Sequence, residues 1–515
     1  MSGRLARLLD WIDGRLNPIV VKELRQAVRG RFVVAVLILS LLGQTVVVAG
    51  FLLTSGINAD RLATTPSGAA TFTVLFTVLF ASTLFFIPIY SGLRMSAERS
   101  DSSADLLFIT TVRPRTIVVG KMLSIAMLTA LIFFSSLPFM VFSYVLRGID
   151  VATILILLAI AFVLVCSQSI GAMFVGCIPA SKPFKFVLAG GFVTLTAVIF
   201  GPLLRFLMEM VRSTSLMTLM APAFWRGLTV WLALVLAVDV VLLVLTAALI
   251  APSTANRALP VRAVFALLWL VSLAAAFWYA KQGRDSHLVL VWAIPNAMIA
   301  VLVLFSAIGE RERWGPRVAR TIPSNLPGRA VAFLFYSGGA GGTLWSMLFL
   351  ASTVGLYQLA VFLFPPRWIE DSSRWYPTWF LHGALALIAY AMTALLLRRT
   401  WLRRVPARVT WGIALALFLF FVLIPPLVLF IGYHGTPVFK EYFVFATMLN
   451  PFPNTDAAPT PLRTIILGGW AFLAFAANGG WLAAQWRAFR PSPSSALAES
   501  DVSTGSLALQ EISRP

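Results

Sequence analysis

Charged residues are scarce in this sequence. They make up 12% of the 515 residues, whereas hydrophobic residues make up 59%, and the mean hydropathy is +0.89. A soluble domain of ordinary composition carries about twice that share of charge. The composition therefore excludes a soluble globular protein and predicts an all-α fold, a polytopic transmembrane helix bundle.

Cysteine and histidine are almost missing as well. The two cysteines, Cys166 and Cys177, lie on one predicted helix, and their spacing puts them roughly 16 Å apart, beyond disulfide reach. The three histidines, His287, His382 and His434, have no partner at ligand spacing. We therefore expect no disulfide framework, no metal site and no cofactor.

Motifs for nucleotide binding and hydrolysis are also missing. The sequence contains no GxxxxGK[ST] loop, no GxSxG and no HExxH. The most glycine-rich stretch, residues 337–342, lies within an apolar run, so we expect its small residues to let helices approach closely. The chain is not expected to be an enzyme, and no catalytic residue is predicted.

Twelve apolar runs are long enough to cross a bilayer. They are residues 32–53, 70–93, 117–146, 151–178, 184–204 and 228–250, then 263–280, 288–308, 330–364, 379–397, 409–432 and 464–486. With the amino terminus inside, 29 of the 40 Lys and Arg residues fall in inner segments and 11 in outer ones. This bias predicts twelve spans with both termini cytoplasmic, and it explains the net charge of +20 without a nucleic-acid partner.

The twelve spans divide near residue 255 into two unequal halves. We expect an interfacial elbow helix over 1–31, a six-span half over 32–255, a further six-span half over 256–490 and a disordered serine-rich tail over 491–515. The inner connection 309–329 is as charged as the connection 94–121, but the second half contains no second copy of its pattern. The outer segment 205–227 is expected to lie at the interface or fold back as a short hairpin, and either it or the proline-rich outer segment 433–463 could cap an outward path.

The elbow begins with a helix-start signal, Asn17 followed by Pro18. Apolar and polar residues then alternate at helical spacing, which is typical of a helix in the membrane interface. The alternative is an ordinary basic flank that fixes orientation. The apolar face is Val20, Leu24, Ala27 and Val28, and the polar face is Lys22, Glu23, Arg25, Gln26 and Arg29.

The connection 94–121 is the most specific polar interval of the chain. Ser102 and Asp105 have the spacing of a capping box before a short apolar run, and Pro114 ends that helix and begins the next. A short amphipathic helix tied to spans at both ends is suited to docking on another protein; the alternative is a solvated loop. Charged residues surround it at Glu98, Arg99, Asp101, Arg113 and Arg115.

Asp239 is the one acidic residue predicted well inside a span. A lone carboxylate there is a functional candidate because its ionised form is costly in the bilayer. The alternative is a neutral or hydrogen-bonded carboxyl that joins two helices. Gln168 is a weaker candidate, since uncharged polar groups commonly join helices.

Over roughly residues 15–250 the chain resembles the permeases of the type-2 ATP-binding-cassette exporter family. The family start N-P-x-x-x-K-E-L-R corresponds to Asn17, Pro18, Lys22, Glu23, Leu24 and Arg25. The segment between spans two and three corresponds to Glu98, Arg99, Asp105, Leu106, Leu107 and Thr110, followed by Pro114, Ile117, Gly120 and Lys121. Residues 256–490 have no counterpart in the usual six-span half.

The resemblance implies a membrane permease subunit, an exporter of the bacterial cytoplasmic (inner) membrane. Its partners would be a cytoplasmic ATP-binding-cassette ATPase subunit, a second permease copy or related permease, and membrane lipid. The elbow residues would be Asn17, Pro18, Lys22, Glu23 and Arg25. The coupling surface for the ATPase would comprise Glu98, Arg99, Asp101, Asp105, Leu106, Leu107, Phe108, Arg113, Arg115 and Lys121.

Two other classes of protein remain open. A membrane-embedded lipid-linked transferase needs clustered outer acids, and only the pair Glu370 and Asp371 is available. A secondary transporter needs paired ionisable groups at mid-membrane, where only Asp239 is found. The shortage of charge in the spans favours a lipid-like or hydrophobic cargo.

Overall fold

The computed structural model describes residues 18–57, 68–100, 114–147, 149–179, 181–213, 221–252, 254–283, 286–310, 314–365, 376–432, 449–450 and 461–491. Every regular element in these ranges is a helix. The prediction of an all-α, multi-span bundle is therefore confirmed. The chain divides into two compact units, Met1–Pro252 (unit 1) and Ser253–Pro515 (unit 2).

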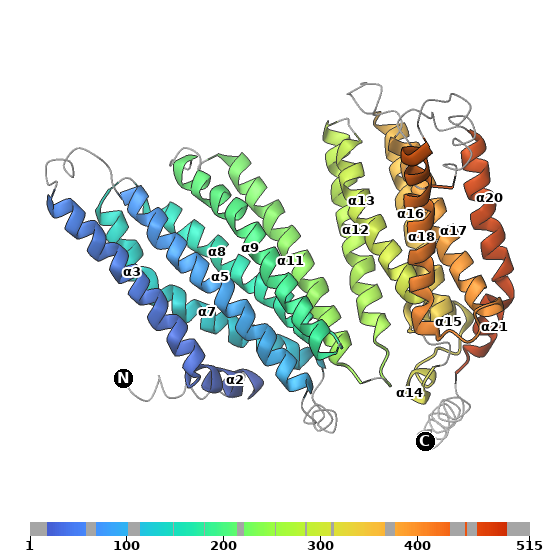
Figure 1. Ribbon diagram of the computed structural model, residues 1–515, viewed down its shortest axis with the longest axis horizontal. Coiled ribbons are helices and arrows are strands. Elements are labelled where there is room, and N and C mark those ends of the chain that lie inside the picture. The colour runs from blue at the N-terminus through green and yellow to red at the C-terminus, as the bar shows by residue number, and fades with distance from the viewer. Residues whose placement is uncertain are drawn as a thin grey trace, which may run out of the picture. The chain divides into compact units, whose positions relative to one another are not determined.

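Unit 1 consists of one short helix and six long ones (Figure 1). They are α2 (Pro18–Val28), α3 (Arg31–Ile57), α5 (Gly68–Ser100), α7 (Pro114–Val145), α8 (Val151–Cys177), α9 (Lys182–Ser213) and α11 (Pro222–Ile250). Prolines stand at the first residue of α2, α7 and α11, where a missing N–H costs nothing. The start of α7 at Pro114 agrees with the prediction.

Helix α5 lies at the centre of unit 1, in contact with α3, α7, α8 and α9. Its buried phenylalanines Phe72, Phe76 and Phe80 stack on one another along one face. Helices α5 and α8 approach closely, since a Cβ on Gly176 would lie 2.5 Å from the carbonyl oxygen of Gly92. Such crossings depend on small residues because lipid supplies no hydrophobic force between helices.

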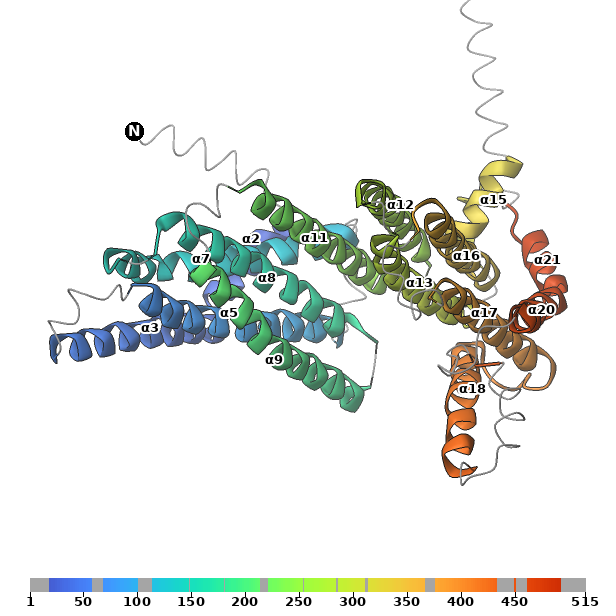
Figure 2. The same cartoon turned by 90° about the horizontal axis from the view of Figure 1, so that it is seen from above.

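Unit 2 contains α12 (Ala258–Gly283), α13 (His287–Ala307), α14 (Pro316–Ala319), α15 (Leu326–Phe335), α16 (Gly339–Leu363), α17 (Tyr376–Thr400), η2 (Ala407–Val409), α18 (Thr410–Gly432), α20 (Pro461–Ala477) and α21 (Gly479–Ala488). Its main contacts run from α13 to α16 and from α17 to α20. Figure 2 shows α18 at the edge of this unit, where it packs on α17.

Ten of these helices are long and apolar enough to cross a membrane, and the bent pair α20 and α21 makes up to eleven. Helix α18 occupies the remaining predicted span, and its part over Thr410–Ile424 is a shorter apolar helix. The protein is therefore a multi-pass membrane protein. The cytoplasmic placement of both termini stays a prediction.

One predicted span, 330–364, is wrong as a single helix. The chain forms α15, breaks at residues 336–338 and starts again as α16. Gly338 has a φ of +155°, which a residue with a side chain rarely adopts. The predicted close approach of the small residues is confirmed, because a Cβ on Gly342 would lie 2.8 Å from the Cβ of Ala307 on α13.

The break is held by a buried arginine of α12. Arg262, 3% exposed, donates to the carbonyl oxygens of Leu334 and Tyr336 at 2.9 and 2.5 Å and binds Glu310 at 3.2 Å. Glu310 in turn accepts from the Gly338 N–H at 2.8 Å. Carbonyl and N–H groups that the break leaves without helical partners are thus satisfied by one ion pair.

The outer segment 205–227 also differs from the prediction. Helix α9 continues past residue 204 to Ser213, and α11 begins at Pro222, so most of the segment extends two spans. The backbone from 205 to 213 contains no glycine or proline to end the helix.

Candidate functional site

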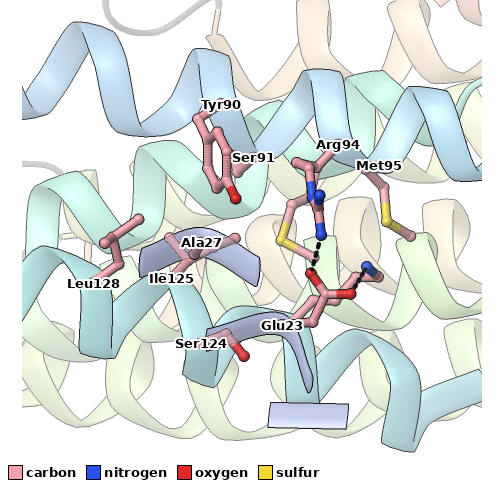
Figure 3. A pocket seen from close by; sticks show the side chains of 11 residues that line it. Glu23, Ala27, Tyr90, Ser91, Arg94, Met95, Ser124, Ile125 and Leu128 are labelled. Carbon is pink, nitrogen blue, oxygen red and sulfur yellow. Dashed lines mark hydrogen bonds and ion pairs between the residues drawn. The ribbon is translucent and has the colours of Figure 1, made fainter. Parts of the chain in front are cut away.

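A buried carboxylate on the elbow joins three helices of unit 1. Glu23 of α2 binds Lys121 of α7 through Oε1 at 2.9 Å and Arg94 of α5 through Oε2 at 3.0 Å. The guanidinium of Arg94 also donates to Oε1 of Gln26 at 2.6 Å. Figure 3 shows Arg94 pointing from α5 towards Glu23. We refer to Glu23, Arg94 and Lys121 as the Glu23 cluster.

The position of the Glu23 cluster matters because Arg94 and Lys121 flank the predicted coupling connection on its two sides. Helix α5 ends at Ser100, and α7 begins at Pro114. One side chain of the elbow therefore contacts both helices that lead into and out of that connection. In Figure 1, α2 lies at the lower ends of the long helices of unit 1.

The three charges of the Glu23 cluster differ in exposure. The side chain of Lys121 is 7% exposed and that of Glu23 is 12% exposed, whereas Arg94 is 35% exposed. Screening by water is therefore weak for the Glu23–Lys121 pair and considerable for Arg94. The pair with Lys121 contributes more of the cluster's stability.

Electrostatics keep Glu23 ionised. Burial alone would raise the pKa of its carboxyl, but the ammonium of Lys121 and the guanidinium of Arg94 outweigh burial and hold the pKa below its ordinary value of 4.5. The carboxylate is therefore charged throughout the neutral range, and both ion pairs persist there.

A small cavity adjoins the Glu23 cluster. Its polar side is formed by the cluster with Tyr90, Ser91 and Ser124, and its apolar side by Ala27, Met95, Ile125, Leu128 and Met173. Figure 3 shows the cavity between the elbow and the helices above and below it.

Further contacts attach the neighbouring segments to the same region. The ring of Phe32 at the start of α3 stacks on Tyr90 of α5, with centroids 5.6 Å apart and planes at 10°. Lys185 at the start of α9 donates to Ser96 of α5 at 3.4 Å. The last turns of α5 before the predicted coupling connection therefore contact α2, α3 and α9.

The structure changes the predicted roles of several elbow residues. Lys22 and Arg25 are exposed as expected, but Glu23, assigned from its spacing to the polar face, is buried, and Val28, assigned to the apolar face, is 49% exposed. The assignment of Glu23 is wrong because two cations from distant helices compensate the burial of its charge. Pro18 is the first residue of α2, and Asn17 lies outside the described residues.

The predicted coupling residues fall into three groups. Glu98 and Arg99 lie in the last turn of α5, and Arg115 is exposed near the start of α7. Lys121 is buried, and its ammonium donates to Glu23. The others, Asp101, Asp105, Leu106, Leu107, Phe108 and Arg113, lie outside the described residues.

Asp239 joins two helices of unit 1. It is 7% exposed, and its Oδ1 accepts a hydrogen bond of 2.6 Å from Ser167 of α8. Gln168, the neighbour of Ser167, donates to Thr196 of α9. Both contacts favour the interpretation of these polar residues as links between helices.

Comparisons of this chain with protein-family models, with curated proteins and with solved structures found no match.

Proposed function

We propose that this protein is the membrane permease subunit of an ATP-binding-cassette exporter, driven by a separate ATPase subunit that docks on residues 94–121. The observation that carries the proposal is the Glu23 cluster, which attaches the elbow to both helices flanking that connection. A partner that displaces the connection moves Arg94 and Lys121, and with them the elbow. Because α2 joins α3 through Arg29 and Gly30, the displacement reaches the first span.

A mechanism follows from this arrangement. ATP binding and hydrolysis on the partner supply the free energy, and the connection 94–121 receives the movement. The Glu23 cluster couples α2, α5 and α7, so these helices shift together and open a path by alternating access or lateral opening. The described spans of unit 1 contain few charges along their length, which favours a lipid-like or hydrophobic cargo.

The test is purification of the tagged full chain from its native membrane in mild detergent, followed by identification of any stoichiometric partner and an assay of vanadate-sensitive ATP hydrolysis. The informative variant exchanges two charges, Glu98→Arg with Arg99→Glu. Opposed like charges in an interface cost several kcal/mol, so we expect retention of the ATPase to fall at least roughly tenfold.

The matched control exchanges Arg205→Glu with Glu209→Arg on α9. Both residues are exposed and lie on the predicted outer side, and their exchange leaves the net charge unchanged. The control is expected to retain the ATPase fully. Absence of any ATPase from the purified chain, or equal retention by the two exchange variants, contradicts the proposal.

A further inference from the structure

The predicted inner end of unit 2 combines arginine and tryptophan side chains from three helices. Arg329 of α15 lies over the ring of Trp486 of α21 at 4.4 Å and donates to the Trp486 carbonyl oxygen at 3.0 Å. Arg399 of α17 lies 5.6 Å from the ring centre of Trp481, also on α21. Each of these two indoles is thus covered by a guanidinium from another helix.

The chain directly after α17 adds exposed side chains of both kinds. Trp401 is 85% exposed and Leu402 41% exposed, and they are followed by Arg403 and Arg404, which are also exposed. Arg403 donates from Nε to the carbonyl oxygen of Arg399 at 3.0 Å, and its side chain is exposed. We call Arg399 together with residues 401–404 the inner rim of unit 2.

Acidic side chains do not balance this charge within the described part of unit 2. Glu310 is the only carboxylate side chain there, and Arg262 already holds it. A ligand of the inner rim should therefore bring negative charge of its own.

We propose that the inner rim of unit 2 binds the phosphate groups of anionic phospholipids. An exposed indole beside exposed guanidinium groups, immediately after a span, matches the boundary of a bilayer, where indoles lie at the headgroup level and cations meet phosphate. The planar guanidinium offers paired N–H donors to phosphate oxygens, and the indole and Leu402 contact the adjoining acyl region. This binding site is independent of the ATPase partner.

The test uses the full chain in detergent, titrated in native mass spectrometry with dioleoyl phosphatidylglycerol and, separately, with dioleoyl phosphatidylcholine. The variant is Arg403→Gln with Arg404→Gln. Both side chains are exposed, so we expect the fold and the thermal stability to be unchanged. The apparent affinity for phosphatidylglycerol should fall about thirtyfold, the fold-change that corresponds to about 1 kcal/mol for each arginine near an anionic surface.

The control is Arg205→Gln with Arg226→Gln, which removes the same charge at exposed positions of unit 1 on the predicted outer side. It should bind phosphatidylglycerol as the unaltered chain does. Equal affinity of the unaltered chain for the two lipids overturns the proposal, as does an unchanged phosphatidylglycerol affinity in the Arg403 and Arg404 variant. The proposal is also overturned if the Arg403 and Arg404 variant loses a co-purifying acidic protein but keeps its affinity for phosphatidylglycerol. That result identifies the rim as a protein-docking surface.

Discussion

Replacement of Glu23 by glutamine tests whether the elbow is held by charge. The variant removes the carboxylate that binds the ammonium of Lys121, a side chain only 7% exposed. Removal of one partner of a buried pair costs about 3–5 kcal/mol, whereas the pair with the more exposed Arg94 contributes about 0–1 kcal/mol. We therefore expect Glu23→Gln to lower the free energy of unfolding by about 3–5 kcal/mol, mainly because the variant loses the Glu23–Lys121 ion pair.

A double-mutant cycle isolates that cause. Lys121→Met leaves Glu23 with Arg94 and should cost less, about 1–3 kcal/mol. The combined variant Glu23→Gln with Lys121→Met removes both members of the Glu23–Lys121 pair between α2 and α7. It should therefore be more stable than Glu23→Gln alone, because replacement of both members of a buried pair is often neutral.

Reversible unfolding in mixed micelles, followed by circular dichroism, measures these free energies. Lys22→Met is the control, since Lys22 is an exposed lysine of the same helix, and it should change the free energy of unfolding by less than about 0.5 kcal/mol. The reasoning fails if the combined variant costs the sum of the two single changes, because the two charges would then act independently.

Three further outcomes are expected. The stability difference between the unaltered chain and Glu23→Gln should persist above pH 4.5 and disappear as the pH falls further, because the folded-state pKa of Glu23 lies below that ordinary value; thermal unfolding against pH measures it. Gly176→Ala should destabilise unit 1 by about 1–3 kcal/mol, since its Cβ meets backbone at 2.5 Å, whereas Gly190→Ala has open space and should be neutral or stabilising in the same assay. Ser167→Ala should cost only about 0.6 kcal/mol if its bond to Asp239 merely joins helices, and a much larger loss in micelle unfolding would refute that role.

The helical spans were predictable because their signal is local. A run of about 20 apolar residues has few alternatives in a membrane protein, and the proline at 114 specifies the start of α7 by its own geometry. Twelve windows found nearly all long helices. The break between α15 and α16 was missed because a hydropathy window of about 20 residues averages over the three residues of the turn. Its available signal was the length of the run 330–364, well beyond a single crossing.

The Glu23 cluster could not be predicted from spacing. Helical periodicity places Glu23 beside Lys22 and Arg25 on a polar face, and the burial of Glu23 depends on cations 71 and 98 residues away. Long-range pairs of this kind leave no periodic trace in one sequence. The motif around residue 23 indicated that the position mattered, but only the packing of α2 on α7 shows what its carboxylate binds.

The distance along the chain between Glu23 and its partners also sets an order of assembly during synthesis. Lys121 follows Glu23 by 98 residues, so at about 5–20 residues per second the elbow waits roughly 5–20 s for its ammonium partner. Until the third span is inserted, the elbow carboxylate lacks Lys121 and can pair within the Glu23 cluster only with the more exposed Arg94 of α5, and α2 lacks its contact with α7. The elbow can therefore reach its final contacts only after the first three spans have been made and inserted. Formation of the Glu23–Lys121 pair is thus a late step in the biogenesis of unit 1.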